Sequence, residues 1–541
     1  MVFILFGYVL YLRPKLKIVK VQSDGAHESM LGDEPKAKIT SKMSKDDEYE
    51  ALQSFLRSIS STATLPPYVK GETYSSVRGV YNQCLITCAV LILAAGAGHP
   101  IGFSAVALPQ LRAENSTMHI SDEDDMGSWI ASIHSAATPF GSMISGWIME
   151  AIGRRRTLQL CVLPLILGWV IIGTAVDHSY VLLGRIVCGL AVGVMAAPSQ
   201  VYLGEISEPR LRGLLIGTPF VAYSLGVLYV YALGGVLLWR TVAYLSMLLP
   251  ALAFVALCFS PESPTWLARR GRFHDAMAAM SRLRGNPDIA QRELHELISA
   301  REKEKARGEE QIHFLATVMR PSVLKPLLLI NAFNLLQILS GSYVVIFYAV
   351  DIVEEAGGSL PPQMAANASA LVRLAVTVIA CVMLLKVTRR SLVLISGVGT
   401  AFCTILLAYI LSQGPGSGFV PPSLILGYVA FNTLGFFLLP GLMIGELLPT
   451  KVRGLCGGYI FCLFNIVLFG FTKLYPIMAR SIGIVGVFAL FGSAACLATI
   501  VLFLMLPETK GKSLLQIEQY YQKSNILWVT RKKMMTDSQT V

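Results

Sequence analysis

The sequence has little charge. Only 15% of its 541 residues are Asp, Glu, Lys or Arg, whereas 54% are hydrophobic, and the mean hydropathy is +0.59. In a soluble globular protein about a quarter of all residues are charged, so this composition excludes that class. Most charges fall in short blocks with long apolar stretches between them. These features indicate a protein embedded in a lipid bilayer.

Several signatures of chemistry are also missing. The chain contains no nucleotide-binding loop and no His/Cys group with metal-ligand spacing, so the sequence gives no support to an enzyme or to a bound cofactor. All ten cysteines, from Cys84 to Cys496, fall in apolar stretches, which excludes an extracellular disulfide framework. The net charge of +11 is better explained by membrane orientation than by nucleic-acid binding.

Twelve apolar stretches are each long enough to cross a bilayer, which takes roughly 20 residues. The expected fold is therefore an all-α membrane protein with twelve transmembrane helices in two six-helix bundles. The predicted organisation is a disordered cytosolic tail (1–80), a first bundle (81–261), a cytosolic helical linker (262–320), a second bundle (321–506) and a cytosolic tail (507–541). The stretches are approximately 84–108, 128–149, 158–176, 180–203, 214–237, 241–260, 323–350, 366–386, 391–412, 422–447, 455–478 and 483–506.

Lys and Arg are unevenly distributed among the predicted loops. Loops after even-numbered stretches carry the arginine clusters 154–156 and 389–390, whereas loops after odd-numbered stretches carry acids such as Asp177. Because basic loops face the cytosol, both termini and the linker are expected there, in a plasma-membrane protein. Asn115 begins an Asn-Ser-Thr tripeptide in the first outer loop and is a possible N-glycosylation site.

One short motif occurs in both halves of the chain. Glu205 is followed seven positions later by Arg212-Gly213. Glu446 is followed at the same spacing by Arg453-Gly454, and the two copies lie 241 residues apart. An arginine cluster precedes each copy, and a Pro-Glu pair follows each. Recurrence in the same order indicates a duplicated unit. Two-bundle transporters are built in this way, with the substrate held between the halves.

The charged residues of these motifs are expected at the cytosolic ends of spans, where half-exposed ions need partners. A ring of carboxylates and guanidiniums that links the two bundles would hold the cytosolic side shut, and separating the bundles would break its pairs. The alternative is that the arginines only fix the topology. The predicted gating residues are Glu150, Arg154, Arg155, Arg185, Glu205, Arg212, Glu262, Arg389, Arg390, Pro440, Glu446, Arg453 and Glu508.

A set of motifs stands in a characteristic order along the chain, among them Gly146–Arg155, Gly184-Arg185, Pro261–Pro264 and Pro507–Lys512. Together they resemble the sugar porter family of the major facilitator superfamily over roughly residues 80–520. Within it, Ser128-Trp129 and Gly445–Pro449 are similar to insect facilitated trehalose transporters. The resemblance implies facilitated transport of a small polar solute, such as trehalose or glucose, by alternating access. It leaves the oligomeric state open.

The resemblance implies substrate contacts in the second half, and several of these positions are altered. Gln337 is retained in span seven, whereas Ile338 and Tyr343 replace an amide each. Arg373 stands in the middle of span eight, where the family usually has asparagine or glutamine. A buried arginine is costly in lipid, so Arg373 should face water or a partner. The expected substrate-binding residues are Gln337, Ile338, Ser340, Tyr343, Arg373, Gly441, Asn465 and Phe220.

Two further departures concern gating and energy coupling. The acid that the family carries before the second arginine pair is Leu385 here, and the glycine is Thr388, so the second half of the gate is expected to be weaker. The first span contains no acid, which favours a uniporter, and His99 there is interpreted as a packing residue. The alternatives that stay open are a carrier of a polyol or organic anion, a proton-coupled sugar symporter, and a solute sensor that transports little and signals through its tails.

Overall fold

A computed structural model describes residues 75–114, 118–121, 125–306, 318–357, 361–414, 418–449, 452–510 and 514–522. The described residues form helices, turns and bends, with no strand among them. They divide into two compact units, Met1–Cys88 with Glu262–Ala306 and Ala89–Pro261 with Arg307–Val541. Most of the predicted N-terminal tail, Asn115 and the side chain of Leu385 lie outside the described residues.

The smaller unit contains the helical part of the predicted linker. Its helices are α10 (Pro264–Arg269), α11 (Phe273–Arg284) and α12 (Pro287–Ala306). Trp266, Phe273 and Leu294 are buried together in its apolar core. Helices α11 and α12 are separated at Gly285, whose φ of 66° favours glycine.

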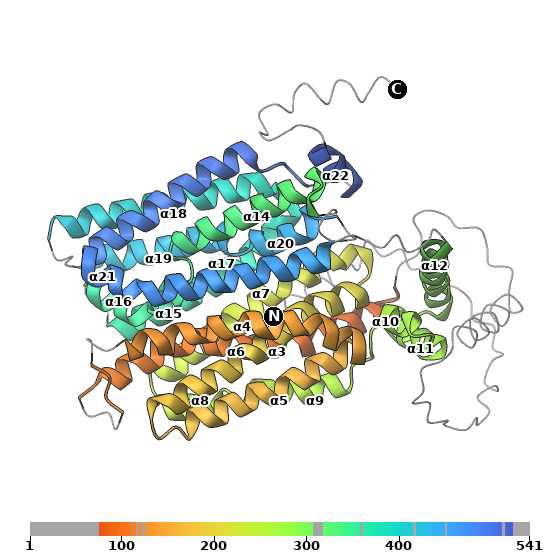
Figure 1. The fold of residues 1–541 in the computed structure, drawn as a ribbon, viewed down its shortest axis with the longest axis horizontal. Coiled ribbons are helices and arrows are strands. Elements are labelled where there is room, and N and C mark those ends of the chain that lie inside the picture. Colours follow the sequence, from red (N-terminus) through yellow and green to blue (C-terminus); the bar gives the residue numbers. More distant parts are fainter. Residues whose placement is uncertain are drawn as a thin grey trace, which may run out of the picture. The chain divides into compact units, whose positions relative to one another are not determined.

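The larger unit contains the two halves of the duplicated sequence. In the first half, α6 packs against both α4 and α5, and the Asp177 carboxylate caps α6 by accepting from the backbone N–H of Ser179 and Tyr180. This half appears in orange to yellow-green in Figure 1. Its helices are α3 (Val77–Arg112, which begins in the smaller unit), α4 (Met126–Ile152), α5 (Arg154–Gly173), α6 (His178–Ile206), α7 (Pro209–Gly234), α8 (Trp239–Leu245) and α9 (Leu248–Cys258).

In the second half, α18 packs against α19 and α21. The seventh predicted span is broken into three helices and the tenth contains a π-helical turn, η2. The helices are α14 (Pro321–Leu339), α15 (Val344–Phe347), α16 (Ala349–Ala356), α17 (Pro362–Lys386), α18 (Arg389–Ser412), α19 (Val420–Asn432), η2 (Thr433–Phe437), α20 (Leu439–Leu447), α21 (Arg453–Met505) and α22 (Leu514–Gln522).

Ten helices within the described ranges are long and apolar enough to cross a membrane. Helix α4 does not meet that criterion, and α21, with 53 residues, contains Gly483 in a non-helical conformation that separates the last two predicted spans. Each of the twelve predicted stretches therefore coincides with a helix or a broken helix. The expected all-α membrane architecture is confirmed.

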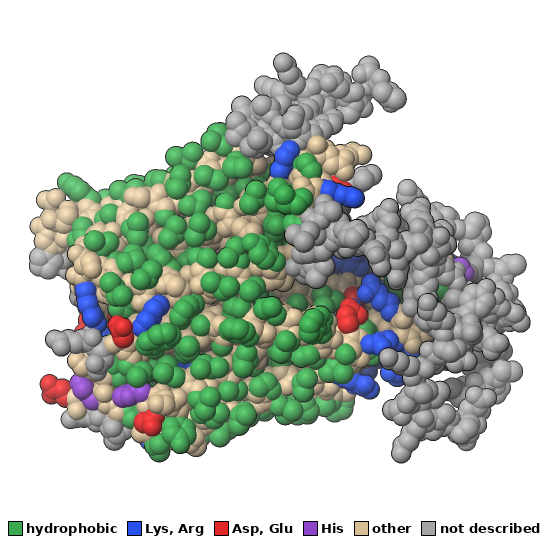
Figure 2. All heavy atoms as spheres, viewed as in Figure 1, with side chains coloured by type: hydrophobic (Ala, Val, Ile, Leu, Met, Phe, Trp, Pro, Cys, Tyr) green, Lys and Arg blue, Asp and Glu red, His purple; other side chains and the backbone are tan. Residues whose placement is uncertain are grey.

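Large apolar side chains cover the flank of the larger unit, while charged side chains gather toward its ends (Figure 2). Trp147 of α4 and Phe402 of α18 are 82% and 63% exposed. A soluble protein would not leave so much apolar surface in water, so this flank is the lipid-facing one. The two halves meet where α4 packs against α21 and α7 packs against α17.

Candidate functional site

Arg373 lies in the middle of α17, at the junction of the two halves, and only 4% of it is exposed. Its guanidinium carbon lies 5.3 Å from the centre of the Phe437 ring, within the range of a cation–π contact. Phe437 belongs to η2, and wide π-helical turns of this kind often occur at functional sites. The arginine is therefore held inside the helix bundle and does not extend toward the lipid surface.

Three tyrosines complete the surroundings of Arg373. Tyr231 of α7, Tyr343 between α14 and α15, and Tyr428 of α19 lie near its guanidinium. One nitrogen, Nη1, is buried and has no hydrogen-bond partner in the described part of the chain. We call Arg373, Phe437 and these three tyrosines the Arg373 cluster. Sequence reasoning missed Tyr231, Tyr428 and Phe437, because packing explains an aromatic residue in an apolar span equally well.

Two predicted substrate residues join this cluster through the break in span seven. Gln337 lies close to the Tyr343 side chain, and the hydroxyl of Ser340 donates to the Gln337 carbonyl at 2.7 Å. The Tyr428 hydroxyl donates to the Ser340 carbonyl at 2.9 Å, and the Asn432 amide donates to the Ser340 hydroxyl. The chain can turn here because Gly341 has a φ of 81°. The break thus brings Gln337, Ser340 and Tyr343 together, as their shared motif predicts.

Aromatic rings also bring Phe220 and Gly441 to this place. The rings of Phe220 and Phe437 are 6.3 Å apart and meet edge to face, and Tyr343 lies against both Phe437 and Phe464. A Cβ atom added to Gly441 would lie 2.6 Å from the Phe220 ring. Because Phe220 belongs to the first half and the other residues to the second, these rings join the halves near Arg373.

The remaining predicted contacts are less closely tied to the cluster. Asn465 donates to the Phe461 carbonyl of its own helix at 2.9 Å, and Ile338 is buried with 1% exposed. Pro440 stands at the beginning of α20, where the backbone N–H that proline lacks is not needed. These positions shape the helices, and their defined contacts do not include the Arg373 guanidinium.

A buried arginine pairs with two carboxylates in the first half. Arg154, at the beginning of α5, lies 2.7 Å from Glu150 of α4 and 3.1 Å from Glu205 of α6, and its side chain is 2% exposed. Its Nη1 also donates to the Met149 carbonyl. Arg155 donates to the Ser260 carbonyl at 2.8 Å. Glu150, Arg154, Arg155 and Glu205 are therefore brought together at one end of the bundle.

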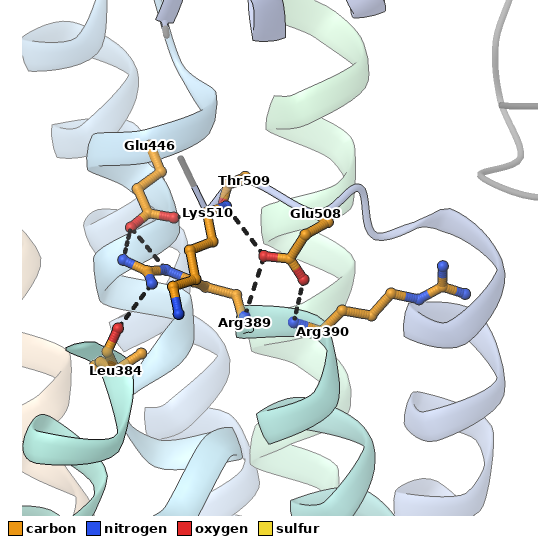
Figure 3. Close-up of polar contacts among 7 residues, drawn as sticks. All are labelled: Leu384, Arg389, Arg390, Glu446, Glu508, Thr509 and Lys510. Atoms are coloured by element: carbon orange, nitrogen blue, oxygen red, sulfur yellow. Dashed lines mark hydrogen bonds and ion pairs between the residues drawn. The ribbon is translucent and has the colours of Figure 1, made fainter. Parts of the chain in front are cut away.

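The duplicated position in the second half has the same geometry with fewer acids (Figure 3). Arg389 lies 3.0 Å from Glu446 and donates to the Leu384 carbonyl, as Arg154 does to Glu205 and Met149. The Glu508 carboxylate accepts from the backbone N–H of Arg389 and Arg390. Glu446 also accepts from the Thr509 hydroxyl at 2.5 Å. With a side chain 19% exposed, Arg389 is less buried than Arg154.

These ion pairs join residues of the same half, whereas the sequence analysis predicts pairs between the bundles. Each arginine pairs with the glutamate of its own repeat. Arg212 and Arg453 donate to the carbonyls of Ser207 and Leu448. We call this end of the larger unit, which carries Arg154 and Arg389, the basic end.

Two predicted gating residues lie elsewhere. Arg185 is fully buried on α6, far from the basic end, and donates to the carbonyls of Pro100 and Ala131. Its contacts tie α6 to α3 and α4, so its role as a gating ion is not supported by its position. Glu262 belongs to the smaller unit, where its carboxylate accepts from the Ser263 N–H.

Salt bridges between the halves lie at the opposite end, which carries Asp125 and Asp351. Lys473 of α21 donates to the Ser128 hydroxyl of α4 at 2.6 Å and lies 3.7 Å from the Asp125 carboxylate. Its ammonium is also 4.4 Å from the centre of the Trp129 ring. Arg112 pairs with Asp351 at 2.9 Å, and the Tyr231 hydroxyl donates to the Ile346 carbonyl. Both salt bridges and both hydrogen bonds cross from one half to the other.

Comparisons with known proteins agree with this architecture. The family model described as "Sugar (and other) transporter" matches residues 85–521. The chain is 30% identical to facilitated trehalose transporter Tret1 of Apis mellifera ligustica over 81% of this chain and 88% of that protein. It is 29% identical to Tret1 of Bombyx mori, over 88% and 95% of the two chains.

Solved structures show the same fold. The proton:xylose symporter XylE superposes with a TM-score of 0.68 at 19% identity, over 82% of this chain and 99% of that one. The inward-open conformation of XylE from E. coli gives a TM-score of 0.66 over 80% and 99%. The predicted resemblance is therefore confirmed, and the chain belongs to the sugar transporter family, as a multi-pass membrane transporter and not an enzyme.

Proposed function

We propose that the protein carries a sugar, such as trehalose or glucose, across the plasma membrane by facilitated diffusion, with both termini in the cytosol. The observation that supports this most directly is the Arg373 cluster with Gln337, at the junction of two halves of a sugar transporter fold. Amide, phenol and guanidinium groups pair with sugar hydroxyls, and aromatic faces pack on the C–H surface of the ring. The relatives named as facilitated trehalose transporters support trehalose as the first candidate.

The contacts between the halves suggest how access alternates. The Lys473 and Arg112 contacts close the end opposite the arginine clusters, whereas the defined ion pairs of the basic end lie within each half. In the outward-facing state the contacts of Lys473 and Arg112 break, and the basic ends of the two halves approach one another. The carboxylates and arginines already positioned there then form the gate.

Facilitated diffusion is supported by the first span. The 89–112 part of α3 contains no Asp or Glu, so it offers no carboxylate to carry a proton. His99 of this helix is buried, its ring stacks on Tyr229 with centroids 4.9 Å apart, and its Nδ1 contacts the Ser246 carbonyl. This environment is that of a packing residue.

Uptake of radiolabelled trehalose and glucose into oocytes or proteoliposomes tests the proposal. We expect saturable uptake that unlabelled sugar competes away and that preloaded sugar accelerates by counterflow. The variant Phe220→Leu keeps an apolar residue but removes the ring that faces Gly441. It should raise the KM for sugar uptake, while the amount of protein at the cell surface changes little. Protein at the cell surface that takes up neither sugar would contradict the proposal.

A further inference from the structure

The strongest unexplained feature of the site is a buried cation for which the described residues provide no carboxylate partner. Arg373 is 4% exposed, and the phenol groups of Tyr231, Tyr343 and Tyr428 lie near its guanidinium. The Phe437 ring offers its face, which stabilises a cation more weakly than a carboxylate does. Nη1 has no hydrogen-bond partner among the described residues. Buried charges are normally paired, so this site lacks the partner that a charged solute could supply.

Two other buried arginines, Arg154 and Arg185, have an acceptor for each of their Nη atoms. Arg154 is 2% exposed and pairs with Glu150 and Glu205. Arg185 is fully buried but donates from both Nη atoms to backbone carbonyls. Arg373 differs from both, because its Nη1 is left without an acceptor at the place where the two halves meet.

From these observations we infer that the site recognises a sugar acid, and that the sugar's carboxylate pairs with Nη1 of Arg373. This inference rests on the proposed function and adds to its neutral sugars a second substrate class, sugars that carry one carboxylate, such as hexuronates and aldonates. Gln337 and the tyrosines remain available for hydroxyl groups, and the rings of Phe437 and Phe220 for the C–H surface. The carboxylate neutralises the guanidinium, so the loaded site carries no net charge through the bundle.

Two matched ligands isolate the charge. Glucuronate and glucuronamide have the same shape and hydroxyl groups, and only the first is an anion. With purified protein, competition against labelled trehalose or thermal stabilisation should show that wild type binds glucuronate about tenfold more tightly than glucuronamide, as expected for a charge-assisted hydrogen bond. Equal affinities in the wild-type protein would overturn the inference, whatever happens in any variant.

Three variants assign the preference to Arg373. Arg373→Gln keeps a polar N–H donor on a shorter side chain but removes the charge, so it should bind both ligands equally. Arg373→Lys should retain a preference for glucuronate. Arg240→Gln removes a cation that donates to the Ala175 carbonyl away from the cluster, and it should leave the preference unchanged. A preference for glucuronate that survives Arg373→Gln would contradict the role of this arginine.

Transport distinguishes this inference from the proposed function. Over a full cycle, a uniporter that carries a sugar acid moves one negative charge across the membrane, because the empty carrier returns with its guanidinium unpaired. Glucuronate uptake into proteoliposomes should therefore respond to an imposed potassium diffusion potential, whereas glucose uptake should not. Saturable uptake of glucose or trehalose without binding of glucuronate would leave the proposed function intact and overturn the sugar-acid inference. Failure of the neutral sugars and of glucuronate alike would overturn both.

Discussion

At the scale of single residues, the equivalent arginines of the two halves, Arg154 and Arg389, differ in the number of carboxylates that pair with them. Arg154 and Arg389 each pair with the glutamate of their own motif and donate to a backbone carbonyl. Arg154 has a second carboxylate in Glu150, whereas the equivalent position in the second half is Leu385. Thr388 can replace the glycine of the first half because its φ is −73°, while Gly153 has a φ of 103°.

This difference predicts unequal effects of removing the two motif glutamates. Glu446→Gln removes the carboxylate that pairs with the Arg389 side chain, so we expect a loss of about 1–3 kcal/mol in stability. Glu205→Gln leaves Arg154 paired with Glu150 and should cost less. Thermal unfolding of the two purified variants measures the difference. An equal or larger loss in Glu205→Gln would show that the second carboxylate does not compensate.

At the scale of helices, breaks in regular geometry place the site. In span seven, α14 ends at Leu339 and α15 begins at Val344. Gly341, which lies between them, has a φ of 81°. Span ten contains η2, which brings Phe437 to Arg373. A regular helix through either span would present a different set of side chains to the junction of the halves, so these breaks decide which residues meet.

Gly341→Ala should therefore disturb both stability and transport. An added Cβ would lie 2.4 Å from the Phe491 ring, and alanine is strained at this φ, so the combined cost is about 1–3 kcal/mol. Gly470→Ala is the control, because a Cβ there meets nothing within 4 Å inside helix α21. Thermal unfolding and sugar uptake should fall in the first variant and stay near wild type in the second. Similar behaviour of the two would show that the break tolerates a side chain.

The contact between α4 and α21 predicts a shift in conformation. Lys473→Gln removes the cation that lies over Trp129 and close to Asp125, so the end opposite the arginine clusters should open more often. A cysteine introduced at Asn367, near Gly235 at the α7–α17 contact, should then react faster with an impermeant thiol reagent in a cysteine-free background. Lys473→Arg keeps the charge and should react at the wild-type rate. Unchanged reactivity in Lys473→Gln would exclude Lys473 as a closing contact.

At the scale of the whole molecule, the duplication arranges ion pairs so that each half is held together as a unit. Glu150, Arg154 and Glu205 connect α4, α5 and α6, and Arg389 with Glu446 connects α18 and α20. Rigid halves that move against one another are the basis of alternating access in two-bundle transporters. Because their internal pairs need not break during this motion, the energetic cost of switching falls mainly on the contacts between halves.

The absence of an acid in the first span gives a prediction for the transport cycle. Neutral sugar uptake into proteoliposomes should be the same with and without an inward proton gradient, and His99→Gln should not create or abolish any dependence on pH. Parallel measurements at equal internal pH control for effects on the protein itself. Uphill accumulation of sugar driven by the gradient would refute the uniport mechanism.

The span-seven motif predicts part of the site, whereas nothing in the sequence points to the aromatic residues around Arg373. Gln337, Ser340 and Tyr343 lie close in sequence, so a single break in one helix brings them together. Tyr231, Tyr428 and Phe437 come from three other elements, and their approach to Arg373 depends on how the halves pack. The gate was predicted from spacing, but spacing does not tell whether an arginine pairs within its half or across the junction.

The sequence by itself determined the membrane class, the helical spans and the duplication, because hydrophobic length and motif spacing are local properties of the chain. Tertiary structure alone decided which residues surround Arg373, that Arg185 is tied to backbone carbonyls, and at which end the halves are joined. These outcomes depend on contacts between distant segments. Their energies are set by burial and geometry, which appear only when the helices are packed.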